Sequence, residues 1–451
     1  MAGGTFDKAV GKVRPGTYVN FVSSERESIK GAERGTVIIP LLNTDYGPAG
    51  EAITLTAAAP DEAMVKLGWS VYDDDASGNM LLIREAFKCA SKVIVYICTA
   101  GTAAATVTAG GLVATAKYKG TRGNKLSFSV VANPVSGFDV SVYLDGAKME
   151  NYEGITSYAD LADSEWITFV AKQTTPGTDD PISAVAGATL TGGTSTTTTN
   201  TNVTDFLTAA GALKWNTMAF PSTDATLLTA CKTKIKYMRE NEGKTVQAVV
   251  SNMTSPDYEG IINVINGYVL DGVTLTAAQA TAWVAGATAG ATYVQSNTYR
   301  AVEGATTVNG VKTHEQSVAA IQAGQFFFST SEAGAVVVEY DINSLVTFAD
   351  GKGESYRKNR VMRVLDSFKS SLMLNFPPNK YDNNSTGWVI MEGIGRSILK
   401  VYAEAGAIYD VDYDNDFKVD TENSFGDQTY FIVGIKPSDS AEKLFFTVTT
   451  R

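Results

Sequence analysis

Residue types that carry most enzyme chemistry are scarce in this chain of 451 residues. It has one histidine, His314, and three cysteines, Cys89, Cys98 and Cys231. A Ser-His-Asp or Cys-His arrangement would have to use His314, but no Gly-x-Ser-x-Gly segment accompanies it. A zinc site built on paired histidines would need a second one. We therefore expect His314 to be a polar loop residue, and we expect no catalytic residue and no enzyme activity.

Two glycine motifs and one acidic run resemble ligand sites only in part. Gly243-Lys244-Thr245 resembles the end of a phosphate-binding loop, but the motif's first glycine would fall at Met238, and the segment runs from helix to strand. Gly393-Ile394-Gly395 lacks the third glycine of a dinucleotide motif. In the acidic run at 410–416, Asn415 stands where an EF-hand loop needs glycine. We interpret that run as an exposed strand with acids on one face, and we expect no cofactor and no metal.

One basic segment stands out against a net charge of −11. That negative charge argues against nucleic acid or anionic lipid as partners through bulk charge. At 100° per residue, residues 355–374 form a helix with one apolar face, made by Val361, Val364, Leu365, Phe368 and Leu372. Its basic residues are Arg357, Lys358, Arg360, Arg363 and Lys369. The pattern is typical either of a solvated helix or of a helix that docks on an acidic partner surface.

Length and composition favour a multidomain protein made in a reducing compartment. At about 150 residues a domain, the chain should hold two to four domains. Three scattered cysteines are too few for a disulfide framework. No apolar run reaches the roughly 20 residues of a membrane span, and no signal-peptide core follows the first residues. We therefore expect folding in a cytoplasm and no membrane insertion.

The hydrophobic pattern predicts an α/β core domain that an all-β domain interrupts. The core would comprise residues 21–98 and 201–343, with residues 93–98 as a strand buried on both faces of a parallel sheet. The inserted domain would span 99–200, because its apolar residues alternate and Asp145-Gly146 is a hairpin turn signal. We interpret its Thr-rich end, 191–200, as an exposed linker.

The rest of the chain predicts a C-terminal α+β domain and two terminal arms. Residues 344–436 contain two amphipathic helices, at about 355–374 and 387–404, followed by strands. Residues 1–20 and 437–451 would be arms that end in or lead into strands. Unpaired strands present free backbone N–H and C=O groups, so such arms suit strand addition to neighbouring chains. The residues expected to pair are Val13, Tyr18, Val19, Phe21, Leu444, Phe445, Phe446 and Val448.

Five segments carry a resemblance to a known family. They are RPGTYVNF at 14–21, AKYKGTRGN at 116–124, DINSLVT at 341–347, KNRV at 358–361 and PSDSAEKL at 437–444. Together, in their order and spacing, they resemble the contractile tail sheath proteins of bacteriophages and phage-tail-like particles, including R-type bacteriocins. The resemblance covers nearly the whole chain.

This resemblance implies a fold and a mechanism. It implies a subtilisin-like core without protease activity, and arms that add strands to neighbouring subunits. Hexameric rings would join into a helical sleeve around a tail tube, and a baseplate would trigger the sleeve to contract and drive the tube through a cell envelope. Partners would be the chain itself, the tube, baseplate and tail terminator proteins. The basic helix at 355–374 would face the tube and the β domain would point outward. Assembly would take place in a bacterial cytoplasm and end in a virion or tail-like particle.

Three other interpretations stay open at this point. The same machine could serve outside a virion, as a bacteriocin or secretion sheath. An enzyme on an α/β scaffold would need a nucleophile–base pair. A surface adhesin, which the β domain and Thr-rich linker suggest, would need an export signal.

Overall fold

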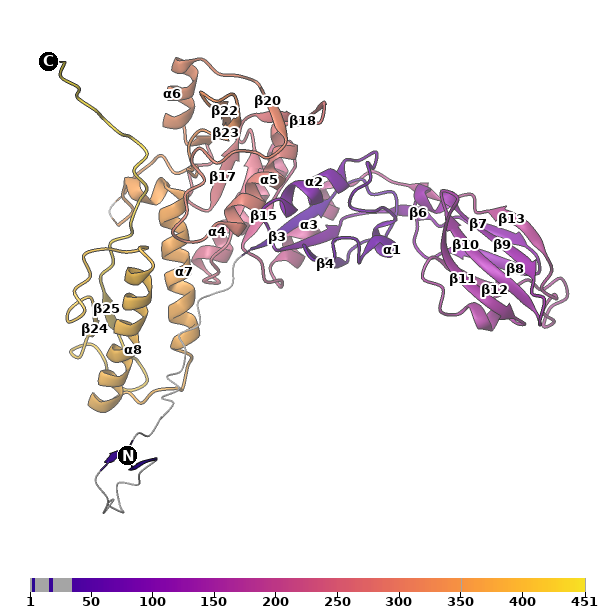
Figure 1. Cartoon of the computed structure of the whole chain (residues 1–451), viewed down its shortest axis with the longest axis horizontal. Helices are drawn as coiled ribbons and strands as arrows, with labels where there is room; N and C mark the ends of the chain where they lie inside the picture. The colour runs from indigo at the N-terminus through magenta and orange to yellow at the C-terminus, as the bar shows by residue number, and fades with distance from the viewer. Residues whose placement is uncertain (1, 5–15, 19–34, 350, 451) are drawn as a thin grey trace. The chain divides into compact units, whose positions relative to one another are not determined.

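The computed structural model describes residues 2–4, 16–18, 35–349 and 351–450. The chain divides into two compact units, which are described separately (Figure 1). The first comprises Met1–Ala32, Ser370–Val401 and Asp412–Gly434. The second comprises Glu33–Lys369, Tyr402–Val411 and Ile435–Arg451.

A seven-stranded sheet forms the centre of the second unit. Its strand order is β21-β17-β16-β15-β3-β5-β4, with every pair parallel except β4 with β5. The strands are β3 (Thr36–Leu41), β4 (Ala52–Thr56), β5 (Lys92–Ile97), β15 (Thr217–Ala219), β16 (Gln247–Ser251), β17 (Ile261–Val264) and β21 (Gln325–Phe326). The apolar run of β5 is buried on both faces after its first residue, so the expectation for 93–98 is confirmed.

Helices cover both faces of this sheet. Val37 and Ile39 of β3 pack with helices α2 and α5, whereas Ile38 between them packs with α3 and α4. Successive strand residues point to opposite faces, so one apolar run serves two cores. The α-helices that precede β21 in the chain are α1 (Met64–Leu67), α2 (Asn79–Phe87), α3 (Asn200–Ala210), α4 (Ala225–Glu240), α5 (Ala277–Gly290) and α6 (His314–Gln322). The buried face of α4 is made by residues that recur at helical spacing, Leu227, Leu228, Cys231, Ile235 and Met238.

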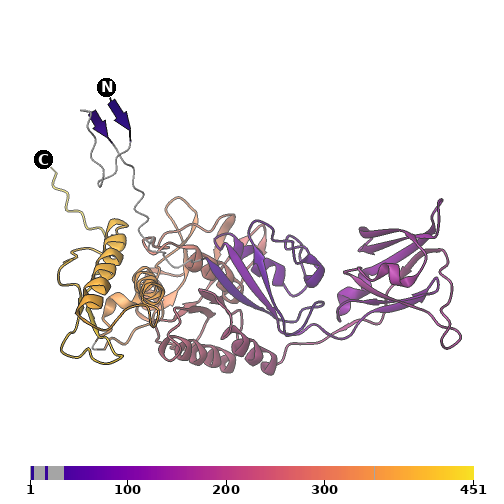
Figure 2. The same ribbon diagram turned by 90° about the horizontal axis from the view of Figure 1, so that it is seen from below.

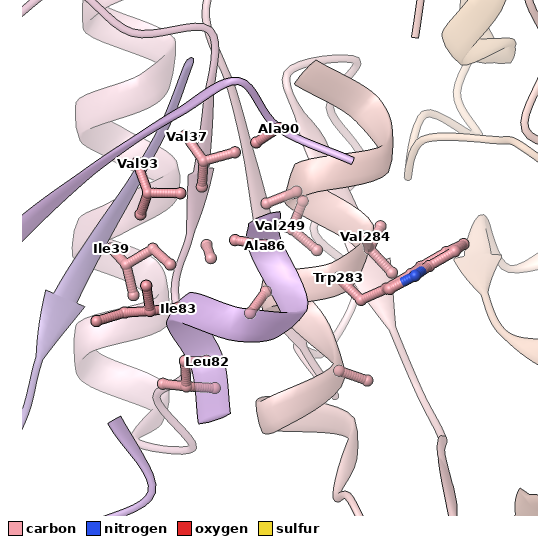
Figure 3. Packing of buried hydrophobic residues seen from close by; sticks show 14 of the residues in the cluster. Val37, Ile39, Leu82, Ile83, Ala86, Ala90, Val93, Val249, Trp283 and Val284 are labelled. Atoms are coloured by element: carbon pink, nitrogen blue, oxygen red, sulfur yellow. The ribbon is translucent and has the colours of Figure 1, made fainter. Parts of the chain in front are cut away.

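Helix α5 packs against α2 at backbone distance. Figure 3 shows this core, in which Ile83 and Ala86 of α2 lie among side chains of the strands and of α5. A Cβ added at Gly286 would lie 2.4 Å from the carbonyl oxygen of Ala86, and one at Gly290 would lie 1.9 Å from that of Cys89. Glycine is therefore required at both positions.

The inserted domain is a β-sandwich with its own apolar core. One sheet has the order β11-β10-β9-β13 and the facing sheet β12-β8-β7, while β14 pairs with β6. The strands are β6 (Gly101–Ala103), β7 (Thr106–Ala109), β8 (Leu112–Ala116), β9 (Leu126–Ala132), β10 (Phe138–Leu144), β11 (Ala147–Ile155), β12 (Ile167–Ala171), β13 (Val185–Thr189) and β14 (Thr194–Ser195), with short helices η1 (Thr121–Lys125) and η2 (Tyr158–Leu161). Asp145 and Gly146 form the β10–β11 turn, with φ of 50° and 80°. The Thr-rich segment is mostly exposed, but it also contains β14 and Thr199, which caps α3.

Smaller elements complete the second unit. Strands β18 (Gly267–Leu270), β19 (Val273–Thr274) and β20 (Ala305–Asn309) form one sheet, and β22 (Phe328–Thr330) pairs with β23 (Val336–Val338). The helix η3 (Glu354–Arg357) precedes α7 (Asn359–Asn375). Residues of α7 up to Lys369 belong to this unit.

The first unit contains the end of α7, most of α8 (Ser385–Glu404) and two small sheets. Strands β24 (Phe417–Val419) and β25 (Phe431–Val433) pair antiparallel, and β1 (Ala2–Gly4) pairs parallel with β2 (Gly16–Tyr18). Phe376 stacks on Phe417, and Phe431 packs tilted against both rings beside α8, where Gly395 leaves room for the ring of Phe417. The two predicted C-terminal helices are thus confirmed.

Two local expectations need correction. Residues 412–415 form a turn rather than a strand, because Asp412 accepts hydrogen bonds from the backbone of Asp414 and the side chain of Asn415. His314 is the exposed first residue of α6, capped by Thr313, instead of a loop residue. Residues 439–450 form no strand within the subunit, and their pairing with a neighbouring chain stays a prediction.

Candidate functional site

The C-terminal arm consists of an anchored root, residues 437–443, and a free part, residues 444–450 of those described. At the start of the root, the Tyr409 amide donates to the Lys436 carbonyl (3.1 Å) and the Ser438 amide donates to the Ala407 carbonyl (2.8 Å). Beyond the root, the chain continues as a single extended trace (Figures 1 and 2). The change from anchored to free chain is therefore abrupt.

Lys358, directly before α7, holds the root through carboxylates. Its ammonium group pairs with Glu442 and lies 3.6 Å from a carboxylate oxygen of Asp439. The Glu442 carboxylate also accepts a hydrogen bond from the Ser296 hydroxyl (2.8 Å). The Lys358 and Glu442 side chains are only 10% and 9% exposed. Burial lowers the pKa of Lys358, and Asp439 opposes that shift.

Two further contacts support the root. Arg360 donates from Nη1 to the Ser440 hydroxyl at 2.7 Å. The Lys358 ammonium lies 4.2 Å from the ring centroid of Tyr340, and that of Lys443 lies 5.9 Å from it. A cation over an aromatic face is attracted by the ring quadrupole. Both lysines are thus held against the same tyrosine.

A buried ion pair lies behind the root. Arg363 donates from Nη2 to Asp341 (2.8 Å), with side-chain exposures of 0% and 1%. The Asp341 carboxylate also accepts from the Asn297 amide (3.0 Å) and the Asn359 side chain (2.9 Å). Burial raises the pKa of Asp341, but the Arg363 charge and these hydrogen bonds outweigh burial and hold it below its usual value. Nε and Nη1 of Arg363 have no hydrogen-bond partner among the described residues.

These contacts change the interpretation of the basic helix. Its predicted apolar face is buried at Val361, Val364 and Phe368, but the neighbouring positions Met362, Arg363, Asp366 and Ser367 are buried too. A fully buried Arg363 has no surface for a partner, and Lys358 and Arg360 are engaged by the arm. The helical spacing showed charges beside an apolar face, but it did not show their acidic partners, which come from distant segments. Arg357 and Lys369 are partly exposed.

Predicted arm residues fall into two groups. Leu444, Phe445, Phe446 and Val448 are 65%, 92%, 83% and 83% exposed. At the other end, Tyr18 closes β2, whereas Val13, Val19 and Phe21 lie outside the described residues.

The residues that sequence reasoning missed are Asp341, Asp439, Glu442 and Ser296. The first three lie in segments 341–347 and 437–444, which had been noted one by one for their resemblance. In the structure, both segments meet residues 358–361 at the root. The spacing of these segments along the chain does not indicate that they come together in the folded subunit.

The metal-ligating and thiol side chains can be compared with the sequence only within the described part of the chain. No group of three or more His, Cys, Asp or Glu side chains there is arranged to hold a metal ion. Burial raises the pKa of Cys98 to about 12 and that of Cys231 further, so neither is a thiolate at neutral pH. No described helix has the length and apolarity to span a membrane.

Family models match the chain in four consecutive parts. They are the Gp18 domain III N-terminal region (34–96), the tail sheath β-sandwich domain (99–205), the tail sheath central domain (196–344) and the tail sheath C-terminal domain (351–451). The Bacillus subtilis phage-like element PBSX protein XkdK is 34% identical over 99% of both chains. The chain belongs to the phage tail sheath protein family.

Solved structures agree with this assignment. The crystal structure of a sheath tail protein from Desulfitobacterium hafniense is 37% identical, with a TM-score of 0.82 over 96% of this chain and 99% of that one. The helical sheath of the anti-feeding prophage in its contracted state has a TM-score of 0.57 over 98% and 100% of the chains at 13% identity, which shows a shared fold. The chain is thus a structural sheath subunit of a phage or phage-tail-like particle.

Proposed function

We propose that this sheath subunit polymerises by giving its free C-terminal arm to a neighbouring copy, and that the resulting sleeve contracts around a tail tube. The observation that carries the proposal is the exposure of Phe445, Phe446 and Val448 next to a root that is firmly held. Exposed aromatic and β-branched residues in an extended segment gain most by burial as a strand on another sheet.

An acceptor for such a strand needs a sheet edge with free backbone groups. Strands β24 and β25 pair only with each other among the described residues. Ile432 of β25 is 61% exposed, so part of this sheet has apolar surface to cover. A contact of one copy's arm with another copy's sheet is heterologous and propagates without closing along the axis, which produces a filament. Hexameric rings joined in this way would form the sleeve.

The N-terminal arm, residues 1–20, would add a second linking strand. For the domains we propose an α/β core at 21–98 plus 201–343, an inserted β domain at 99–200 and a C-terminal domain at 344–436. A parallel sheet with helices on both faces supports a subtilisin-like core, and exposed His314 supports the absence of protease activity. We propose the tail tube, baseplate and tail terminator proteins as partners and a bacterial cytoplasm as the assembly site. Tube contact in this region would fall to Arg357, the last residue of η3, and to Lys369 of α7. A bacteriocin or secretion sheath is the alternative setting.

Negative-stain electron microscopy of the protein expressed alone tests arm exchange. We compare the full chain with a chain that ends at Lys443, which keeps the whole root. We expect hollow striated cylinders or rings from the full chain and separate particles from the shortened one. A matched control is Val135→Ser, which removes a side chain that is 91% exposed on the β-sandwich and should leave assembly unchanged. Cylinders that survive the truncation would rule out the C-terminal arm as the link.

A further inference from the structure

Half-buried and exposed residues alternate along the root from Ser438 to Lys443, and every described residue after Lys443 is exposed. Glu442 has a side chain that is 9% exposed, whereas Leu444 is 65% and Phe445 92% exposed. The boundary at Lys443 therefore separates a part built into the subunit from a part available to others.

Lys358 connects the root to the rigid interior. Its backbone bridges to Ile342, and the amide of the next residue, Asn359, donates to the Asp341 carbonyl at 3.1 Å. Asp341 is the residue that pairs with buried Arg363. A continuous chain of contacts thus runs from the core through Lys358 to Glu442.

We propose that Lys358 and Glu442, supported by the Arg360–Ser440 hydrogen bond, form a clamp that keeps the arm root on its own subunit, so that exchange is confined to the residues after Lys443. The inference rests on the proposed arm exchange. Because the pair is buried, salt screens it little, and the clamp holds at ionic strengths that weaken surface pairs. The hinge of the arm then lies at Lys443 and Leu444. The seven described residues after Lys443, 444–450, span up to about 23 Å when extended, at about 3.3 Å each.

Such a clamp has a mechanical consequence for a sheath that changes shape. Tension on an exchanged arm passes through Glu442 and Lys358 into α7 and the Asp341–Arg363 pair. Subunits then rotate about the short segment after the root, and the root itself does not unzip. Lys358 is in this sense a positioning residue for the arm.

Hydrogen exchange measured by mass spectrometry on the unassembled subunit tests the clamp. We compare Lys358→Met with Lys436→Met, a matched control that removes a lysine from an exposed ion pair with Asp410 on the same segment (3.5 Å, 61% and 67% exposed). In Lys358→Met we expect the Tyr409 and Ser438 amides to exchange at least about tenfold faster. The control should match the wild type, and thermal unfolding reports whether the body of each variant is intact.

Each result decides the question. Faster root exchange in Lys358→Met with unchanged exchange in the central sheet supports the clamp, and unchanged root exchange overturns it. Should Lys358→Met lower protection throughout the protein, Glu442→Ala decides, because its side chain belongs to the arm and Asp439 still lies 3.6 Å from the Lys358 ammonium group. Electron microscopy of the wild type tests arm exchange independently of the clamp. Absent cylinders would overturn exchange, and the root protection would still report on the clamp.

Discussion

Helix α5 and the arm root are both held by buried contacts, but they are built from opposite materials. Helix α5 meets α2 through Gly286, Gly290 and alanines, with no charged side chain in its sequence. The root is held by Lys358 and Glu442 and backed by the Asp341–Arg363 pair. One contact is close-packed and apolar, and the other is charged.

This difference determines how each contact depends on its partners. Apolar burial is favourable for each side chain separately and requires only complementary shape. A buried ion pair gains little over an apolar pair of similar volume, yet removal of one partner leaves an uncompensated charge. The α5 contact is therefore a permanent part of the core. The root holds the arm only while all its partners are in place, which suits a segment whose direction has to be specified.

The largest expected effect comes from breaking the charged region at its most buried point. Arg363→Met leaves Asp341 buried without its cation and should lower the free energy of unfolding by about 3–5 kcal/mol. Arg396→Met, at a partly exposed pair with Glu392 (3.7 Å, 38% and 16% exposed), is the control and should change it by about 1 kcal/mol or less. Chemical denaturation measures both. Equal changes in the free energy of unfolding for the two substitutions would show that burial does not make the Asp341–Arg363 pair more important for stability than a partly exposed pair.

A smaller effect is expected in the apolar region. Gly290→Ala places a methyl group 1.9 Å from the Cys89 carbonyl oxygen and should cost about 1–3 kcal/mol of stability as α5 and α2 move apart. Gly393→Ala in α8 meets nothing within 4 Å and should stabilise by about 0.5–1 kcal/mol through helix propensity. If close packing at Gly290 causes the loss, thermal unfolding should show changes in stability of opposite sign for the two variants. The same sign in both would remove that explanation.

The smallest effect is a dependence on pH that only the charged region should show. The folded pKa of Asp341 lies below its ordinary value, so its contribution to stability is complete above about pH 4 and is lost as pH falls through the folded pKa. Relative to Asp341→Asn, the wild type should lose about 1 kcal/mol or more of stability between pH 5 and pH 2. Urea denaturation at each pH measures this. Parallel curves for both proteins would contradict the lowered pKa, and Gly290→Ala should follow the wild type throughout.

Periodicity and turn chemistry were sufficient for much of the fold. The buried run of β5, the apolar face of α4, the Asp145-Gly146 turn and the α7 and α8 helices all follow patterns that repeat within a few residues. The same local reasoning failed at 412–415, because short acidic residues bond to nearby backbone and form a turn that alternation alone does not reveal.

What the sequence determined by itself was therefore the buried strand at 93–98, the Asp145-Gly146 turn and the two C-terminal helices, since each depends on residues that are close along the chain. Only the tertiary structure decided where the charges of α7 go. Arg363 finds Asp341 from 22 residues away and Lys358 finds Glu442 from 84 residues away. The physical reason is that an unpaired charge is not tolerated in the interior, so its partner depends on the path of the folded chain and not on its neighbours in sequence.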